Sequence, residues 1–322
     1  MTQVKAIRFQ ATGGPEVLEV VHVDLPDPGP GEVRVRHRAI GVNFIDTYHR
    51  RGLYPVATPC VPGVEAAGVV EAVGPGVTRL SPGDRVVYFC DTPGSYAEAR
   101  VLPERWVVPL PEPIDFAEAA AGWLKACTAE FLVERCVRAQ PGQWVVVTAA
   151  AGGMGLLLCR WLAEVGAVAI AVASTAEKRA RALAAGAAHA LAYDDWAADV
   201  RRLTDGCGAH AVIDGVGRTT FHPALDALRR RGLLVSFGNA SGPVGPVDLG
   251  ILARKGSLFT TRPTLFDYYA EPQEFAAGTA RVLSMWPKLQ VQVGARRPLD
   301  AAAAVHAELE ARQTSGSTVL EP

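Results

Sequence analysis

The sequence predicts an α/β protein in which a β-rich domain is followed by a domain built on a doubly wound parallel sheet. Three observations carry this prediction. The chain has 322 residues, which is longer than a single hydrophobic core usually grows. Its first third consists of short apolar runs bounded by Gly and Pro, and from Gln143 onward strand-like and helical runs alternate.

The β-rich part contains segments with the period-two alternation of half-buried strands. Residues 33–39, which read VRVRHRA, alternate apolar with basic or polar side chains. Further strands are predicted at 69–73, 84–89 and 97–101, spaced as in a small barrel. A last strand candidate, 317–320, is expected to return to this domain. The predicted domain therefore comprises residues 1–124 and is completed by 264–322.

The second domain, predicted for 125–263, begins inside an alanine-rich helical stretch at 115–137. Repeated βα units of this length imply a parallel sheet with helices on its faces. Strands are expected at 144–147, 168–172, 190–192, 211–213 and 233–237, with helices to Glu164, over 178–185, over 196–203, and through Leu225 and Leu228.

The composition favours a globular protein that acts on a small molecule. Apolar residues make up 49% and charged residues 20%, and no apolar run is long enough for a membrane span. The net charge is -1 with both signs interspersed, so no basic stripe indicates a nucleic-acid partner. The N-terminus has no apolar signal core, so a cytoplasmic location is expected. The six cysteines lack a Cys-x-x-Cys pair, which argues for reduced, mostly buried thiols rather than a zinc cluster or disulfides.

A glycine-rich turn follows the first strand of the second domain. The segment 150–155 reads AAGGMG and leads into an apolar helix, which is the spacing of a dinucleotide fingerprint with alanine in the first glycine position. Glycines there allow the backbone to approach a pyrophosphate, whose charge the free amides at the helix start stabilise. Tight packing of helix on strand is the alternative explanation. The predicted cofactor contacts are Gly152, Gly153, Met154 and Gly155.

The end of the next strand indicates which nicotinamide cofactor is bound. An acid at this point usually binds the ribose diol of NADH, whereas a cation binds the 2′-phosphate of NADPH. Residues 173–179 place no acid at the strand end, and Lys178 lies within reach beside Ser174. NADPH is therefore the predicted cofactor. Alternatively, Lys178 and Arg179 are solvated cations at a helix start.

Several motifs together resemble the zinc-independent quinone oxidoreductases of the zeta-crystallin type, within the medium-chain dehydrogenase/reductase superfamily. The resemblance covers essentially the whole chain and is carried by GGPEVL at 13–18, GVNFIDTY at 41–48, GLYP at 52–55, GDRV at 83–86, AAAGGMG at 149–155, RGLLVSFGN at 231–239 and GSLFTTRP at 256–263. It implies a GroES-like barrel as the catalytic domain and a Rossmann domain for the nucleotide. It also implies a homodimer that pairs the exposed sheet edge near 257–262.

The resemblance also bears on metal. Alcohol dehydrogenases of the superfamily have Gly-His-Glu where this chain has Gly63-Val64-Glu65, and a ligand cysteine in the region written here as 43–46. Valine cannot bind zinc, and Cys60 alone cannot rebuild the site. A metal-free reaction is therefore expected. Without a Lewis acid the acceptor must itself delocalise the incoming charge, as a quinone or a conjugated enone does.

The resemblance assigns site residues. Asn43, Asp46, Tyr48 and Tyr54 are expected beside the nicotinamide and substrate, with Tyr48 as a hydrogen-bond or proton donor to the quinone oxygen. The alternatives are a turn side chain for Asn43, a cap for Asp46, and packing for the tyrosines. Tyr193 is expected near the adenine, and Lys178 and Arg312 around the 2′-phosphate, although Arg312 is equally explained as a solvated cation. Further cofactor contacts are expected from Asn43, Thr128, Phe237 and Gly238.

Three functions remain open at this point. The first is an NADPH-dependent quinone reductase, by hydride or electron transfer, and the second is an NADPH-dependent reductase of activated alkenes or enones. The third belongs to another class, a nucleotide-binding protein with a structural or RNA-binding role. The seven histidines form no cluster and none is expected to be catalytic; His22, His37 and His49 are interpreted as surface or strand residues.

Overall fold

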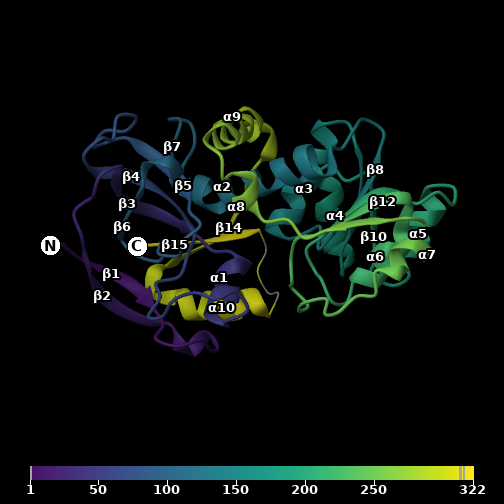
Figure 1. Cartoon of the computed structure of the whole chain (residues 1–322), viewed down its shortest axis with the longest axis horizontal. Helices are drawn as coiled ribbons and strands as arrows, with labels where there is room; N and C mark the ends of the chain where they lie inside the picture. Colours follow the sequence, from purple (N-terminus) through teal and green to yellow (C-terminus); the bar gives the residue numbers. More distant parts are fainter. Residues whose placement is uncertain (1, 312–313, 315) are drawn as a thin grey trace. The chain divides into compact units, whose positions relative to one another are not determined.

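The computed structural model describes residues 2–311, 314 and 316–322, and it divides the chain into two compact units (Figure 1). The first unit comprises Met1–Leu124 and Val291–Pro322, and the second comprises Lys125–Gln290. Residues 264–290, which the sequence analysis placed with the first domain, therefore belong to the second unit. Among the described residues, no helix is both long and apolar enough to cross a membrane.

The first unit is built on a seven-stranded sheet and a separate β-ribbon. The sheet has the order β14-β15-β3-β4-β5-β7, and β6 pairs with β3. Its central strand, β3, alternates buried with more exposed side chains and pairs antiparallel with β4, β6 and β15. The predicted return of the C-terminal strand is confirmed, since Val319 of β15 lies opposite Gly41 of β3. The strands are β1 (Thr2–Arg8) and β2 (Glu19–Leu25) of the ribbon, and β3 (Glu32–Gly41), β4 (Glu65–Val73), β5 (Arg85–Phe89), β6 (Ala99–Pro103), β7 (Val107–Pro109), β14 (Val293–Pro298) and β15 (Ser317–Glu321) of the sheet.

Two helices of the first unit, α1 (Phe44–Arg50) and α10 (Ala302–Glu310), are joined by an ion pair. The side chain of Arg50 is fully buried and donates from Nη2 to both carboxylate oxygens of Glu310, each at 2.8 Å. A buried guanidinium is costly without such a partner, so this contact fixes α1 against α10. Short 3-10 turns complete this unit at Pro15–Val17, Glu104–Trp106 and Leu299–Ala301.

The second unit contains a six-stranded parallel sheet with the order β10-β9-β8-β11-β12-β13. The strand order reverses beside β8, so the carboxyl ends of β8 and β11 form the switch point at which such sheets bind ligands. The α/β fold class, with a β-rich unit and a parallel, Rossmann-like sheet, is thus confirmed. The strands are β8 (Trp144–Thr148), β9 (Val168–Val172), β10 (His189–Leu191), β11 (Ala209–Asp214), β12 (Leu228–Ser236) and β13 (Phe259–Thr261).

Helices pack on this sheet as the βα pattern requires. Helix α3 contacts β8 and β9, and α6 contacts β11 and β12. A core of apolar side chains lies where α5 and α6 cover the sheet, with Val146, Ile170 and Leu225 all fully buried. The sequence analysis carried one helix through Leu228, but Leu228 begins β12, because it pairs with Ala209 of β11. The helices are α3 (Gly153–Glu164), α4 (Ala176–Ala184), α5 (Trp196–Leu203), α6 (Phe221–Ala227), α7 (Gly250–Arg254) and α8 (Leu265–Tyr268).

The predicted helix at 115–137 consists of two different helical forms. Helix α2 (Phe116–Glu130) continues directly into a π-helical segment, Phe131–Val137, which ends at Arg138 in the left-handed region with φ 54°. The wider turns are accompanied by a polar anchor, since Glu130 accepts hydrogen bonds from Arg135 at 2.8 Å and from Tyr269 at 2.7 Å. The composition predicted a helix there but carried no signal for the change of pitch.

Helix α9 (Pro272–Leu289) was not predicted, and it explains why 264–290 belongs to the second unit. It contacts α3 and buries a stripe at helical spacing. Lys288 also donates to Glu164 of α3 at 2.7 Å. Pro272 in the first turn and Pro287 in the last turn read as loop signals, although neither position interrupts the middle of the helix. The stripe consists of Phe275, Gly278, Thr279, Val282, Met285, Trp286 and Leu289.

Candidate active site

The glycine turn after β8 has the geometry of an anion site at a helix start. Gly152 is the N-cap of α3 and, lacking a side chain, provides no side-chain cap for the first-turn amides. A Cβ on Gly155 would lie 2.5 Å from both the Ala149 oxygen and the Ala150 Cα. This position therefore requires glycine for close packing of helix on strand. Gly152, Gly153 and Met154 are exposed or half-buried at the turn, and their contact with a phosphate stays a prediction.

Tyr193 lies beside this turn. Its hydroxyl oxygen accepts a hydrogen bond from the Ala149 amide at 2.9 Å, although the two residues are 44 positions apart. The ring is half-buried. The structure thus brings Tyr193 to the glycine turn, as a cofactor contact requires, while its contact with an adenine stays a prediction.

The end of β9 presents two cations with different environments. Thr175 caps α4 by accepting from the Lys178 amide at 3.2 Å, and Ser174 is exposed at the strand end. Arg179 donates to the carbonyl oxygens of Ala173 and Ser174 at 3.3 and 3.4 Å. The ammonium of Lys178 forms no ion pair within the described residues. Lys178 is therefore the better placed of the two cations for a phosphate, and Arg312, its predicted companion, lies outside the described residues.

The switch point is organised by Asp214, which sequence reasoning missed. Its fully buried carboxylate accepts from the hydroxyl groups of Thr148 at 2.6 Å and Thr220 at 2.7 Å, and from the Gly217 amide at 3.0 Å. It therefore joins the end of β8 to the loop after β11. An acid directly after the apolar run 211–213 was the available signal.

Two predicted cofactor residues after β12 lie against the same loop. A Cβ on Gly238 would overlap the backbone of Gly215, and the half-buried ring of Phe237 also faces Gly215. Thr128 is half-buried on α2.

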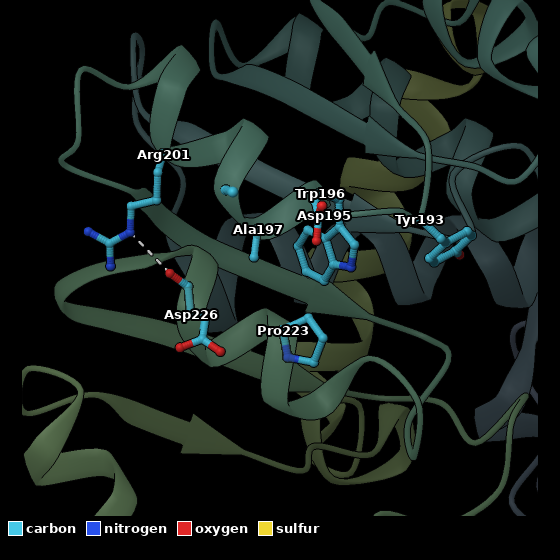
Figure 2. Close-up of a pocket in the computed structure, with 8 residues that line it drawn as sticks. Tyr193, Asp195, Trp196, Ala197, Arg201, Pro223 and Asp226 are labelled. Carbon is cyan, nitrogen blue, oxygen red and sulfur yellow. Dashed lines mark hydrogen bonds between the residues drawn. The ribbon is translucent and has the colours of Figure 1, made fainter.

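A cavity of about 560 Å³ lies between α5 and α6 (Figure 2). Figure 2 shows Trp196 and Pro223 facing each other across it, with Arg201 at one end. The guanidinium of Arg201 donates to main-chain oxygens of Asp226 at 3.0 Å and Leu228 at 2.6 Å. These hydrogen bonds hold α5 to the end of α6 and the start of β12. The carboxylate of Asp226 pairs with Lys255. These polar groups are used internally, and the cavity shares only Tyr193 with the predicted site.

In the first unit, the predicted residues Asn43 and Asp46 meet at the start of α1. Asn43 is the N-cap, and the Asp46 carboxylate accepts from its backbone amide at 2.8 Å and from the Tyr96 hydroxyl at 3.1 Å. Asp46 is fully buried. These contacts match the capping alternative for Asp46, and its place beside the nicotinamide stays a prediction.

The side chain of Asn43 is held by a residue that the sequence analysis did not single out. Its Nδ2 donates to Oε1 of Glu65 at 2.6 Å, and the other carboxylate oxygen of Glu65 accepts from the Leu124 amide at 2.8 Å. Glu65 is fully buried at the start of β4. An acid inside the apolar run from Val64 to Ala67 was the signal for this contact.

Tyr48 and Tyr54 form an aromatic pair. Their ring centroids lie 5.3 Å apart in an edge-on arrangement, and Phe44 lies 6.2 Å from Tyr48. Both tyrosines are half-buried, and the Tyr54 amide donates to the Tyr48 carbonyl oxygen at 3.2 Å. A half-buried aromatic pair suits a planar ring substrate, and it equally satisfies the packing alternative.

Three histidines of the first unit, His37, His49 and His306, are buried and neutral at physiological pH. The interpretation of His49 as a surface or strand residue was wrong, since it lies in α1 and is 7% exposed. Burial lowers the pKa of His37 and of His49 to about 4, and that of His306 to about 3. His306 Nε2 lies 3.0 Å from the Tyr96 hydroxyl, whose proton points to Asp46. His306 is therefore the Nε2–H donor in a chain that ends on the Asp46 carboxylate.

Residues 60–65 do not fit zinc. Val64 is fully buried and has no ligating atom. Burial raises the pKa of the Cys60 thiol to about 11, although the nearby charge of Arg100 opposes this, so without a metal ion the thiol stays protonated at neutral pH. Among the described residues, no group of three His, Cys, Asp or Glu side chains is arranged to hold a metal ion. The absence of a metal remains a prediction.

Comparison with known proteins gives consistent matches along the chain. Residues 29–112 match the alcohol dehydrogenase GroES-like domain family, and residues 153–271 match the zinc-binding dehydrogenase family. A quinone oxidoreductase of Pseudomonas aeruginosa is 46% identical over 99% of both chains. A crystal structure of Escherichia coli quinone oxidoreductase complexed with NADPH has 41% identity and a TM-score of 0.96 over 99% of this chain and 100% of that one.

A relative with a differently named activity is also similar. The 2-haloacrylate reductase of a Burkholderia species is 39% identical over 99% of both chains, and a crystal structure of 2-haloacrylate reductase matches with a TM-score of 0.88 over 99% of both chains. High identity over full length, together with the matching fold, is decisive for family membership. The chain belongs to the quinone oxidoreductase family of the medium-chain dehydrogenase/reductase superfamily.

Proposed function

We propose that this protein is an NADPH-dependent quinone reductase that transfers hydride without a metal ion. The observation that carries the proposal is the full-length similarity to quinone oxidoreductases, one of which was crystallised with NADPH. The uncapped glycine turn at the start of α3 and the presence of Lys178 in the first turn of α4, directly after β9, support the cofactor from this chain's own residues.

The residues that would hold NADPH divide by the part of the cofactor that they bind. The amides at the start of α3 bind the pyrophosphate, and Lys178, together with Arg312, binds the 2′-phosphate. Tyr193 packs near the adenine. Once bound, NADPH supplies a hydride from its nicotinamide ring. The remaining proposed contacts are Asn43, Thr128, Ser174, Phe237 and Gly238.

On the acceptor side, the protein orients the quinone and stabilises the oxygen that gains charge. Tyr48 donates a hydrogen bond to that oxygen. Tyr54 packs edge-on against Tyr48 and restricts the orientation of the Tyr48 ring. Asn43 and Asp46 fix the backbone at the start of the helix that carries Tyr48. A quinone spreads the incoming charge over its ring, so no Lewis acid is needed.

A second candidate is the reduction of activated alkenes, which the 39% identity to a 2-haloacrylate reductase favours. A steady-state screen with NADPH and NADH distinguishes the candidates, using several quinones, an alkenal and a haloacrylate. We expect the highest kcat/KM with a quinone and NADPH. Higher values with the alkenes would favour the second function. Tight NADPH binding without turnover of any acceptor would favour a structural or RNA-binding role.

We also propose a cytoplasmic homodimer that pairs β13 with its copy. Among the strands that the structure describes, this edge strand has a neighbour only in β12, and Phe259 on it is 60% exposed. Pairing of two β13 edges would cover Phe259 and extend the sheet. Thr260→Pro should shift the protein to the monomer in sedimentation equilibrium, because proline removes a strand amide. A dimer that survives this change would place the interface elsewhere.

A further inference from the structure

The Gly63-Val64-Glu65 motif keeps a glutamate although its neighbour is valine. Glu65 is 0% exposed. Burying a carboxylate costs several kcal/mol unless hydrogen bonds replace the lost water, so the fold must supply donors to it. The metal chemistry of related enzymes does not explain Glu65 here, because Val64 and Cys60 do not form a zinc site.

Two donors come from separate parts of the first unit. Asn43 Nδ2 donates to Oε1 at 2.6 Å, and the Leu124 amide donates to Oε2 at 2.8 Å. Space for the carboxylate is provided by Gly41, where a Cβ would overlap both Oε1 of Glu65 and the Ala120 oxygen. The glycine that opens the GVNFIDTY motif therefore makes room for the acid that binds the asparagine of the same motif.

This arrangement fixes the orientation of the Asn43 amide. A carboxylate only accepts hydrogen bonds, so Nδ2 of Asn43 must face Glu65 and its Oδ1 must face away. The backbone of Asn43 is fixed separately, since its amide donates to Asp46 at 2.8 Å. Asn43 Oδ1 is thus fixed on the side away from Glu65, where it faces the Asp46 amide in the capping box of α1, and its second lone pair can accept from another donor.

We propose that Glu65 is a positioning residue that holds Asn43 Oδ1 as an acceptor for a donor group on the nicotinamide half of the cofactor. The donors of that half are the carboxamide NH₂ and the ribose hydroxyl groups. The proposal rests on the proposed function only in placing Asn43 beside the nicotinamide. Glu65 acts through Asn43 and does not itself contact the cofactor.

Placing the amide at position 65 and the carboxylate at position 43 tests this inference. In Glu65→Gln, the introduced side chain has one acceptor oxygen and one NH₂ group. It cannot accept hydrogen bonds from both Asn43 and Leu124, so its NH₂ group faces one of these two donors. In Asn43→Asp, two carboxylates face each other. In the double variant, the introduced glutamine accepts from Leu124 and donates to the introduced aspartate, whose second oxygen replaces Oδ1 of Asn43. The hydrogen bonds are then complete again, with the direction of one of them reversed.

The readout is NADPH affinity, measured by nicotinamide fluorescence without an acceptor, so it does not depend on which acceptor is natural. The dissociation constant for NADPH should rise at least about tenfold in each single variant, and the double variant should recover most of that loss of affinity. Adenosine 2′,5′-bisphosphate lacks the nicotinamide half and should bind all three variants as it binds the wild type. Glu71→Gln, on the exposed face of the same strand, is the matched control and should bind NADPH unchanged.

Two results would overturn the inference. One is wild-type NADPH affinity in Glu65→Gln. The other is a double variant whose losses simply add, which would mean that Glu65 only stabilises the fold through Leu124. Failure of the proposed function is separate: it would show as wild-type enzyme that binds NADPH and reduces no quinone, whatever the outcome of the exchange.

Discussion

Single residues of the first unit owe their positions to partners far away in the sequence. The GVNFIDTY motif pointed to Asn43, Asp46 and Tyr48 together, and the structure places all three at the start of α1 or within it. The partners Glu65 and Tyr96 lie 22 and 50 residues from the groups they bind. No periodicity links such positions, so the sequence could single out these residues but not the hydrogen bonds that fix them.

Lys178 is the residue on which cofactor preference should depend. Lys178→Gln removes the cation and should lower kcat/KM for NADPH by about tenfold to a hundredfold, because a charge-assisted phosphate contact contributes about 1.5–3 kcal/mol. The value for NADH should not change. Lys178→Arg keeps the charge and serves as the control. Equal losses with both cofactors in Lys178→Gln would mean that the residue only stabilises the start of α4.

Elements with a strong hydrophobic period could be predicted, and elements defined by tertiary contacts could not. The strands of the parallel sheet were found because they are continuous apolar runs between Gly and Pro. Helix α9 was missed since Pro272 and Pro287 resemble loop signals, while its buried stripe has meaning only against α3. The π-helical segment after α2 is accompanied by contacts of Arg135 with Tyr268 and of Glu130 with Tyr269, which no local pattern encodes.

The glycine turn of α3 allows packing and cofactor binding to be separated. Gly155→Ala places a Cβ 2.5 Å from two backbone atoms and should lower the free energy of unfolding by about 1–3 kcal/mol. Gly152→Ala is the matched change: Gly152 is exposed with φ -74°, and its Cβ would meet only the Ala149 oxygen, at 3.4 Å. We expect near wild-type stability and weak NADPH binding for Gly152→Ala, by urea unfolding and fluorescence titration. Unchanged NADPH affinity in Gly152→Ala would show that the pyrophosphate does not approach this turn.

At the scale of the whole molecule, the change of pattern near residue 124 was visible in the sequence, and the structure divides the chain between Leu124 and Lys125. The return of the chain to the first unit was predicted at residue 264, whereas the structure has it at 291, because α9 was not predicted. The sequence also did not predict which polar side chains are buried. His37 and His49 were interpreted as surface or strand residues and His306 was not singled out, yet each of the three is less than a tenth exposed.

These three histidines predict how stability depends on pH. Each has a folded-state pKa lowered by burial, to about 4 for His37 and His49 and about 3 for His306. As pH falls through 6.5, the unfolded chain takes up protons that the folded chain does not bind until those lower values. The free energy of unfolding should therefore fall between about pH 7 and 4, by about 1.4 kcal/mol per pH unit for each histidine once it is protonated in the unfolded chain.

Urea unfolding at about pH 7, 6 and 5, at fixed protein concentration, checks this prediction. His49→Gln removes one titrating group. The slope of the free energy of unfolding against pH should therefore fall by about 1.4 kcal/mol per pH unit, which corresponds to one proton. Stability that rises on acidification, or a slope that His49→Gln leaves unaltered, would show that these histidines are protonated in the folded protein.

The most direct test of metal-free hydride transfer is the oxidation of NADPH by a quinone with enzyme depleted of metal by a chelator and analysed for residual zinc. Rates with NADPH and with NADPH deuterated at nicotinamide C4 are compared before and after depletion. We expect an unchanged rate and a primary isotope effect on kcat/KM in both preparations. Loss of turnover on depletion, with recovery when Zn²⁺ is added, would contradict the account.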